Sequence, residues 1–217
     1  MKNLKVIILA AGDGFRWRNY TGVPKHQVVV EGEILIERTA KQFLKYTNDV
    51  TIVATDDSSK VEGCSLYIPE LNRKNKELDK FLSSKNLWSE HKTILVFGDV
   101  YFTDEAIDKI ITNDTEWSFY LRKGQSQLTG KAYGEVFALS FESSFNDKMT
   151  KALDEVGPDT SSPGAWSVLI HLLKLNTTND IFRTKSNYGY TIVDDWTDDF
   201  DYPEDFDLWN RNRKRYL

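Results

Sequence analysis

Short apolar runs alternate with longer amphipathic stretches through the first half of this chain. Three runs rich in Val, Ile and Leu, at residues 6–9, 49–54 and 92–97, have the length and composition of buried strands. Between the first two runs, residues 34–46 place apolar side chains at helical spacings. Strand, loop, helix and strand within about fifty residues form the βαβ rhythm of an open parallel sheet. The pattern predicts an α/β fold with ligands at the carboxyl ends of the strands.

The rest of the chain continues in the same way. Further strands are predicted at 27–30, 65–68, 118–121, 135–139 and 190–193, and further helices at 71–88, 104–111, 141–156 and 163–175. Residues 122–134, rich in Lys, Gly, Gln and Ser, predict a long loop or hairpin, and a last helix begins at Pro203. We therefore expect one domain over residues 1–217, Rossmann-like, with a mixed, mostly parallel sheet flanked by helices.

Composition narrows the class of protein. The chain has 217 residues, of which 40% are hydrophobic and 28% charged, and these values are typical of a folded globular protein. A net charge of −5 argues against nucleic-acid binding through a basic surface. The single cysteine, Cys64, excludes an internal disulfide framework and a cysteine-based zinc site. Residues 1–11 are too short an apolar run for a signal peptide or a membrane span, so a cytoplasmic protein is expected, and a homo-oligomer stays possible.

The segment 4–25, LKVIILAAGDGFRWRNYTGVPK, delivers a strand into a loop suited to phosphates. Small residues leave the backbone N–H groups free to face an anion, and cations follow within a few residues. The small residues, which follow Leu9, are Ala10, Ala11, Gly12 and Gly14. The cations are Arg16, Arg18 and Lys25, and Pro24 stiffens the backbone before Lys25. A phosphate group is the ligand that this combination favours.

Two familiar nucleotide-binding motifs fit the same loop poorly. A dinucleotide fingerprint requires a third glycine where this chain has Trp17, and the Gly-Lys-Ser/Thr ending of a P-loop is missing. Glycines that only turn the chain after a core strand remain an open alternative.

Two carboxylate positions lie beyond the loop. The strand at 92–97 runs into Gly98-Asp99, which places the Asp99 carboxylate at the same sheet edge as the glycine loop and suits Mg²⁺. The alternative role for Asp99 is to cap the helix at 104–111, although Thr103 is better placed for that. Residues 194–207, DDWTDDFDYPEDFD, hold eight acidic side chains in fourteen positions. These form either an exposed acidic loop or, between a strand and a helix start, an ordered corner that holds a cation.

Taken together, these motifs resemble nucleotidyltransferases that make nucleotide-activated sugars, polyols and cholines, including cytidylyltransferases and the molybdopterin guanylyltransferase. The resemblance rests on LAAG-x-G-x-R with Pro-Lys, on Gly-Asp, and on DFDYPEDF near the end, where Tyr202 and Phe206 replace Thr and Leu of the family pattern. It implies a GT-A-like fold, with the backbone of Leu9, Ala10, Ala11, Gly12 and Gly14 around the nucleotide. It also implies that Arg16 and Lys25 bind phosphates and that Asp99 and Asp201 hold Mg²⁺, with Asp199 as the rival of Asp201.

The expected reaction is Mg²⁺-dependent transfer of a nucleoside monophosphate, CMP by preference, from a nucleoside triphosphate to a phosphorylated small molecule. The acceptor stays open among sugar, polyol and choline phosphates and sugar acids, and pyrophosphate is released. Two rivals remain, a GT-A-type glycosyltransferase using a nucleotide sugar and a non-catalytic nucleotide-binding module. Cations around the loop favour a triphosphate over a nucleotide sugar.

Several polar residues have no assigned chemistry at this point. Lys131, Tyr133 and Glu135 either contact the acceptor or belong to a structural hairpin. Arg73, Lys74 and Lys76 are expected in solvent at the start of a helix, with the triphosphate as the alternative ligand. The three histidines have no partner at metal-ligand spacing, and His171 is expected in the core or an interface.

Overall fold

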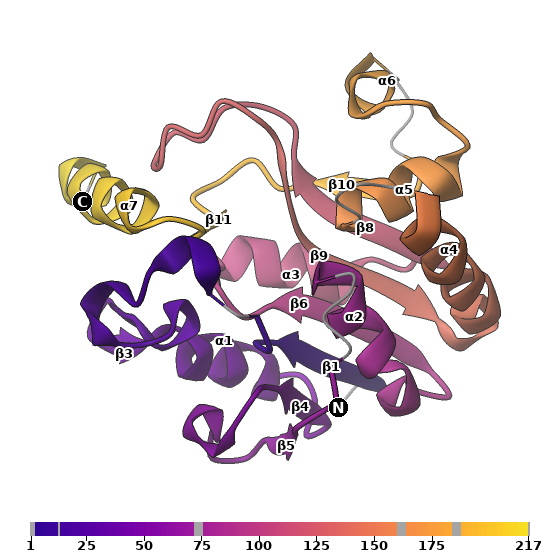
Figure 1. The fold of residues 1–217 in the computed structure, drawn as a ribbon, viewed down its shortest axis with the longest axis horizontal. Helices are drawn as coiled ribbons and strands as arrows, with labels where there is room; N and C mark the ends of the chain where they lie inside the picture. Colours follow the sequence, from indigo (N-terminus) through magenta and orange to yellow (C-terminus); the bar gives the residue numbers. More distant parts are fainter. Residues whose placement is uncertain (1–2, 13, 72–75, 160–163, 184–187, 217) are drawn as a thin grey trace.

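One seven-stranded sheet with helices on both faces forms the body of the molecule (Figure 1). The computed structural model describes residues 3–12, 14–71, 76–159, 164–183 and 188–216. The strand order is β10-β8-β9-β6-β1-β4-β5, and β9 alone runs antiparallel to its neighbours in this described sheet. The strands are β1 (Leu4–Leu9), β4 (Val50–Val53), β5 (Ser65–Tyr67), β6 (Lys92–Phe97), β8 (Trp117–Arg122), β9 (Glu135–Glu142) and β10 (Tyr190–Ile192). The predicted mixed, mostly parallel sheet is confirmed.

Side chains of β1 alternate between the two faces of the sheet, which is why its residues form a continuous apolar run. Val6 and Ile8 pack in one core, and Ile7 and Leu9 pack in the other. The first core is covered by α1 (Leu35–Leu44) and α3 (Asp104–Thr112). The second is covered by α2 (Lys76–Ser83), α4 (Asn146–Asp159) and α5 (Ala165–Leu173), with α6 (Thr178–Arg183) at its edge.

Two small antiparallel pairs lie outside the main sheet. They are β2 (Val29–Val30) with β3 (Glu33–Ile34), and β7 (Val100–Tyr101) with β11 (Asp198–Asp199). The last helix, α7 (Pro203–Tyr216), follows β11 and stands apart from the sheet in Figure 1.

A third apolar cluster joins α7 to the segment after the glycine loop. Trp17 and Trp209 are both fully buried in it, together with Phe200. The Trp17 indole also donates a hydrogen bond from Nε1 to the carbonyl of Val23, at 2.9 Å. Arg16, the neighbour of Trp17, lies beside the start of α7, with its guanidinium carbon 5.5 Å from the centre of the Tyr202 ring.

Some predicted boundaries were wrong. Phe141 belongs to β9 rather than to the helix predicted at 141–156, because it is fully buried opposite Trp117, and the periodicity of a short apolar run does not distinguish strand from helix. The helix α4 begins at Asn146 and continues through Gly157 to Asp159. The stretch 71–88 contains a shorter helix, α2, followed by a 3-10 turn at Lys85–Leu87.

Of the two positions predicted for His171, the core or an interface, the core is wrong. Its side chain is 41% exposed on α5, and its Nε2 lies 3.1 Å from a carboxylate oxygen of Glu155. Arg73, Lys74 and Pro163 lie outside the described residues. Within the described part of the chain, no helix combines the length and apolar character that crossing a membrane requires.

Candidate active site

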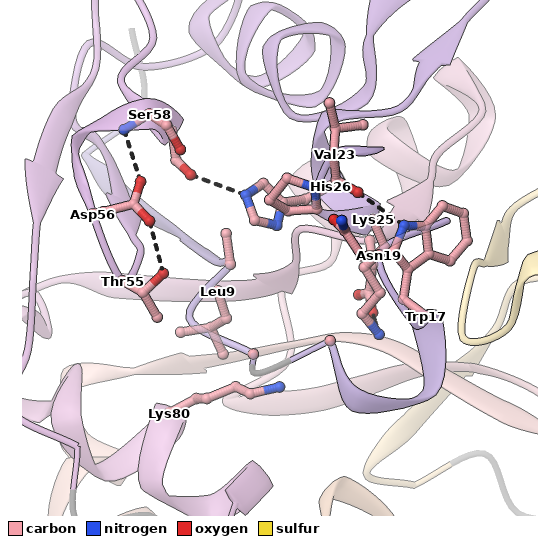
Figure 2. Close-up of a pocket in the computed structure, with 16 residues that line it drawn as sticks. Leu9, Trp17, Asn19, Val23, Lys25, His26, Thr55, Asp56, Ser58 and Lys80 are labelled. Carbon is pink, nitrogen blue, oxygen red and sulfur yellow. Dashed lines mark hydrogen bonds and ion pairs between the residues drawn. The ribbon is translucent and has the colours of Figure 1, made fainter. Parts of the chain in front are cut away.

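The glycine loop opens onto a cleft of about 350 Å³ at the carboxyl edge of the sheet (Figure 2). Gly14 has φ 61°, a left-handed conformation that glycine adopts without strain. A Cβ atom at Gly12 would lie 3.1 Å from Nζ of Lys80, which extends from α2 toward the loop. The cleft, called the first cleft below, is lined by Leu9, Ala10, Gly12, Gly14, Trp17, Asn19, Val23, Pro24, Lys25, His26, Thr55, Asp56, Ser58, Ser59, Lys80 and Asp99. Four of the five predicted loop residues are among them, whereas Ala11 packs into the core.

Gly98 explains how Asp99 comes to lie against this loop. Its N–H donates to the carbonyl of Leu9 at 3.0 Å, and a Cβ atom at position 98 would lie 3.1 Å from Cβ of Ala10. Any larger residue at position 98 would require Ala10 or the backbone of β1 to shift by a few tenths of an ångström. The Gly-Asp pair therefore combines a close contact between two strands with a carboxylate that lines the cleft.

Antiparallel pairing of β7 with β11 brings the acidic segment to Asp99. Asp199 pairs with Val100, and the N–H of Phe200 donates to the carbonyl of Asp99 at 3.0 Å. Phe200 points into the third cluster and is fully buried, and Asp199 and Asp201 on either side of it line one cleft. Two aspartates separated by one residue therefore face the same cleft, because the residue between them points into the core.

Four predicted site residues meet at one point. The Lys25 ammonium contacts Oδ2 of Asp99 and lies 3.2 Å from Oδ1 of Asp201, and the Arg16 guanidinium donates to the same Oδ1 at 2.7 Å. Although burial lowers the pKa of Lys25, the two carboxylates outweigh it and raise this pKa. Burial likewise raises the pKa of Asp99, but Lys25 and Lys80 reverse the shift and bring it to about 2. Lys25 and Asp99 are therefore both charged at neutral pH.

The hairpin loop between β8 and β9 covers the other side of the acidic corner, as Figure 1 shows where it reaches toward α7. Asp198 is buried and accepts hydrogen bonds from Arg122 at 2.8 Å, from Thr129 at 2.8 Å and from the Ser126 hydroxyl. We call this arrangement the Asp198 pocket. It ties the hairpin to β11.

Lys131 from the same hairpin neutralises the next carboxylates. Its ammonium lies 2.6 Å from Oδ2 of Asp199 and 3.1 Å from Oδ2 of Asp205, and the side chain is buried. Asp205 also accepts the N–H groups of Asp201 and Tyr202, at 3.0 and 2.9 Å, and so caps α7. Lys131 is thus a structural partner of the acidic corner.

Glu135 begins β9 beside the corner. It forms with Asp199 and Asp201 a group of three carboxylates whose facing oxygens all lie within 4.8 Å of one another. Burial raises the pKa of Glu135, and the charge of Asp199 raises it further. Burial also raises the pKa of Asp199, against the opposing effect of Lys131. The hydroxyl-bearing Tyr133, whose role was open, is 52% exposed.

A second cleft of about 180 Å³ adjoins the first, and the two share Lys25, Lys80 and Asp99. It is lined by Arg16, Lys25, Glu77, Lys80, Phe97, Asp99, Val100, Glu135, Val136, Gly164, Ala165, Trp166, Ser167, Asp199 and Asp201. The cations at the junction can therefore face ligands in both clefts. Glu77, Lys80 and Trp166 were not predicted, because nothing in a surface-like helical pattern marks which residues turn toward a site. Arg18, predicted as a third cation, is exposed.

Comparisons with known proteins show the fold. No protein-family description matches the chain, and no curated protein matches it in sequence. Among solved structures, it is similar to the CTP:phosphocholine cytidylyltransferase from Streptococcus pneumoniae, with a TM-score of 0.64, 16% identity, and coverage of 97% of this chain and 99% of that one. It is also similar to the inositol-1-phosphate CTP transferase from T. maritima, with a TM-score of 0.61, 14% identity, and coverage of 98% and 96%.

A third similar structure is the 2-C-methyl-D-erythritol 4-phosphate cytidylyltransferase from Thermus thermophilus, with a TM-score of 0.61, 14% identity, and coverage of 98% of this chain and 100% of that one. The chain therefore has the fold of sugar-phosphate and cytidylyl nucleotidyltransferases over nearly its whole length. The fold that the sequence resemblance implied is confirmed.

Proposed function

We propose that this protein is a nucleotidyltransferase that transfers a nucleoside monophosphate from a nucleoside triphosphate to a phosphorylated small molecule. The observation that carries the proposal is the meeting of Arg16 and Lys25 with Asp99 and Asp201 at the junction of two clefts. CTP is the preferred donor in this proposal, because the DFDYPEDF corner resembles that of cytidylyltransferases.

The two clefts divide the substrates. The triphosphate would lie in the first cleft, with its phosphates against the N–H groups of the glycine loop. The acceptor would lie in the second cleft, with its phosphate toward the shared Lys25. This arrangement aligns two anions that repel each other in water.

The donor chemistry of Asp99 and Asp201 fits Mg²⁺. Both offer carboxylate oxygens, and the Lys25 ammonium between them shows that positive charge is stabilised at this point. Magnesium typically binds through one or two carboxylates together with substrate phosphates, so the two aspartates would hold it on the triphosphate. When bound, it would neutralise charge on the α-phosphate.

In the proposed reaction, an oxygen of the acceptor phosphate attacks the α-phosphorus. A new phosphorus–oxygen bond forms, the bond between the α-phosphorus and the bridging oxygen to the β-phosphate breaks, and pyrophosphate leaves with the electron pair. Arg16 and Lys25 stabilise the negative charge that develops. No protein nucleophile is required. Burial lowers the pKa of His26 to about 4, so this side chain is neutral and contacts Ser59 at 2.9 Å.

Pyrophosphate release tests the proposal directly. The protein is incubated with Mg²⁺, each of the four ribonucleoside triphosphates, and a panel of phosphorylated sugars, polyols and amino alcohols together with sugar acids. Release with one triphosphate, lost with EDTA and in Asp99→Asn, is expected. Asp114→Asn, a change at an exposed aspartate, is the matched control and should keep full turnover. Metal-dependent binding of a triphosphate without release from any pair would instead indicate a non-catalytic module.

A further inference from the structure

We propose that Glu135, Asp199 and Asp201 form a second divalent-cation position, which shares Asp201 with the first and is filled before nucleotide binds. Its use in catalysis rests on the proposed function, whereas the binding of the cation can be tested without it. Geometry, one unpartnered oxygen and charge all favour a cation here.

The three carboxylates come from two elements that the fold holds together. Glu135 pairs with Arg122 across β8 and β9, and a Cβ atom at the preceding Gly134 would lie 2.4 Å from the Arg122 carbonyl oxygen. This close approach fixes where β9 begins and therefore where Glu135 stands. With Asp199 and Asp201 it presents three oxygens within 4.8 Å of one another.

One carboxylate oxygen of Asp199 lacks a partner among the described residues. Asp199 is 6% exposed, and its Oδ2 is held by Lys131, but its Oδ1 has no hydrogen-bond partner within the described part of the chain. Burying a carboxylate oxygen without compensation is costly, and buried polar atoms are nearly always paired. A cation among the three carboxylates would supply the missing partner.

The charge of the second cleft agrees with this. Its lining contains five carboxylates and three cations, so acidic side chains outnumber basic ones there. Lys131 is shared between Oδ2 of Asp199, at 2.6 Å, and Oδ2 of Asp205, at 3.1 Å. Between Asp99 and Asp201, by contrast, the Lys25 ammonium already occupies the gap. The position at Glu135 is therefore the one that attracts a cation in the absence of a triphosphate.

The donor set also indicates the kind of cation. Three carboxylates without histidine or cysteine favour Mg²⁺, Mn²⁺ or Ca²⁺ over zinc. Manganese is the practical probe, because free Mn²⁺ can be counted by electron paramagnetic resonance.

The test titrates Mn²⁺ into the full-length protein without nucleotide. Wild-type protein should bind one Mn²⁺ per chain, Glu135→Gln should weaken that binding by about tenfold or more, and Asp99→Asn should change it by less than about threefold. Glu142→Gln is the matched control, because it neutralises a glutamate at the opposite end of the same strand, where the side chain is 41% exposed. This variant should bind as wild type does.

Three results would overturn the proposal: no Mn²⁺ binding by wild-type protein, wild-type affinity in Glu135→Gln, or loss of binding in Asp99→Asn alone. If Glu135→Gln does not fold, as judged by its circular dichroism and melting, Asp199→Asn replaces it with the same expected loss. Pyrophosphate release by a protein whose Glu135→Gln variant binds Mn²⁺ normally would refute the cation position and leave the proposed function standing. Mn²⁺ binding that depends on Glu135, with no reaction from any substrate pair, would support the cation position and refute the proposed function.

Discussion

The Asp198 pocket and the open face formed by Asp199 and Asp201 lie on opposite sides of one short strand, and they treat the same type of side chain differently. Asp198 accepts three hydrogen bonds from side chains of the hairpin, which closes it off. Asp199 has Lys131 on one oxygen and, among the described residues, no hydrogen-bond partner on the other, and Asp201 lines the second cleft. The comparison teaches that full pairing marks a structural carboxylate, whereas incomplete pairing at a cleft marks one available for ligands.

The largest effect is expected on the open face. Asp201→Asn should lower turnover about a thousandfold, or about 4 kcal/mol of transition-state stabilisation, because it removes a proposed metal ligand that also orients Arg16 and Lys25. Its free energy of unfolding should change by less than about 1 kcal/mol, since Lys25 keeps Asp99 as a partner. Steady-state pyrophosphate release and urea unfolding measure the two quantities. Turnover of Asp201→Asn within about tenfold of wild type would contradict the distinction between structural aspartates and aspartates available for ligands.

A change in the Asp198 pocket should lower stability more than turnover. Asp198→Asn leaves Arg122 buried without a carboxylate and should cost about 3 kcal/mol in the free energy of unfolding. Turnover per folded molecule should fall by less than about tenfold. Urea unfolding, with Asp114→Asn as control, provides the measurement, and a loss below about 1 kcal/mol would show that Ser126 and Thr129 alone hold the hairpin.

The sequence predicted the parts of this site that depend on local chemistry. The strands, the glycine loop and the Gly-Asp pair could be predicted because each depends on residues that are adjacent in the sequence. Gly14, with its left-handed φ, and Gly98, with its close approach to Ala10, are examples. The strand-to-helix corner was likewise recognisable from Pro203 and the flanking apolar residues.

The rest depended on contacts between distant segments. Lys131 meets Asp199 across 68 residues, and Lys80 reaches the glycine loop from a helix whose polar pattern resembles that of any exposed helix. The start of α4 was misplaced because Phe141 is apolar in either element. Which carboxylate is left incompletely paired also follows only from the folded geometry.

A smaller effect extends the comparison to the first cleft, where His26 is a buried group kept neutral. Its pKa in the folded protein is about 4, below the ordinary value of 6.5, because burial disfavours the charged form. The unfolded chain therefore binds more protons between these values, and stability falls as pH drops through 6.5. At about pH 5 the loss should be about 2 kcal/mol relative to about pH 7.5.

His26→Gln removes this titration. The difference in unfolding free energy between wild type and the variant, measured in urea at both pH values, should shrink by about 2 kcal/mol at about pH 5. An unchanged difference would mean that His26 is protonated in the folded protein.

The smallest effect concerns the cap of α3 beside the acidic corner. The Thr103 hydroxyl accepts the N–H of Ala106 at 3.0 Å, as the sequence predicted, and donates to Asp195 at 2.9 Å. Thr103→Ala should cost about 1 kcal/mol in the free energy of unfolding without changing turnover, and Thr103→Ser should restore most of it. A thermal melt of the three proteins would decide this, and an unaltered melting temperature in Thr103→Ala would contradict it.

The order of the two clefts along the chain has a consequence for biosynthesis. Every residue named for the first cleft precedes position 100, whereas Asp198, Asp199 and Asp201 follow the last strand of the main sheet. Arg122 is translated 76 residues before Asp198, and Lys131 is translated 68 residues before Asp199. The hairpin that carries these two cations thus cannot close until nearly all of the polypeptide has left the ribosome. The junction of the two clefts, where Arg16 and Lys25 meet Asp201, would therefore assemble only at the end of synthesis.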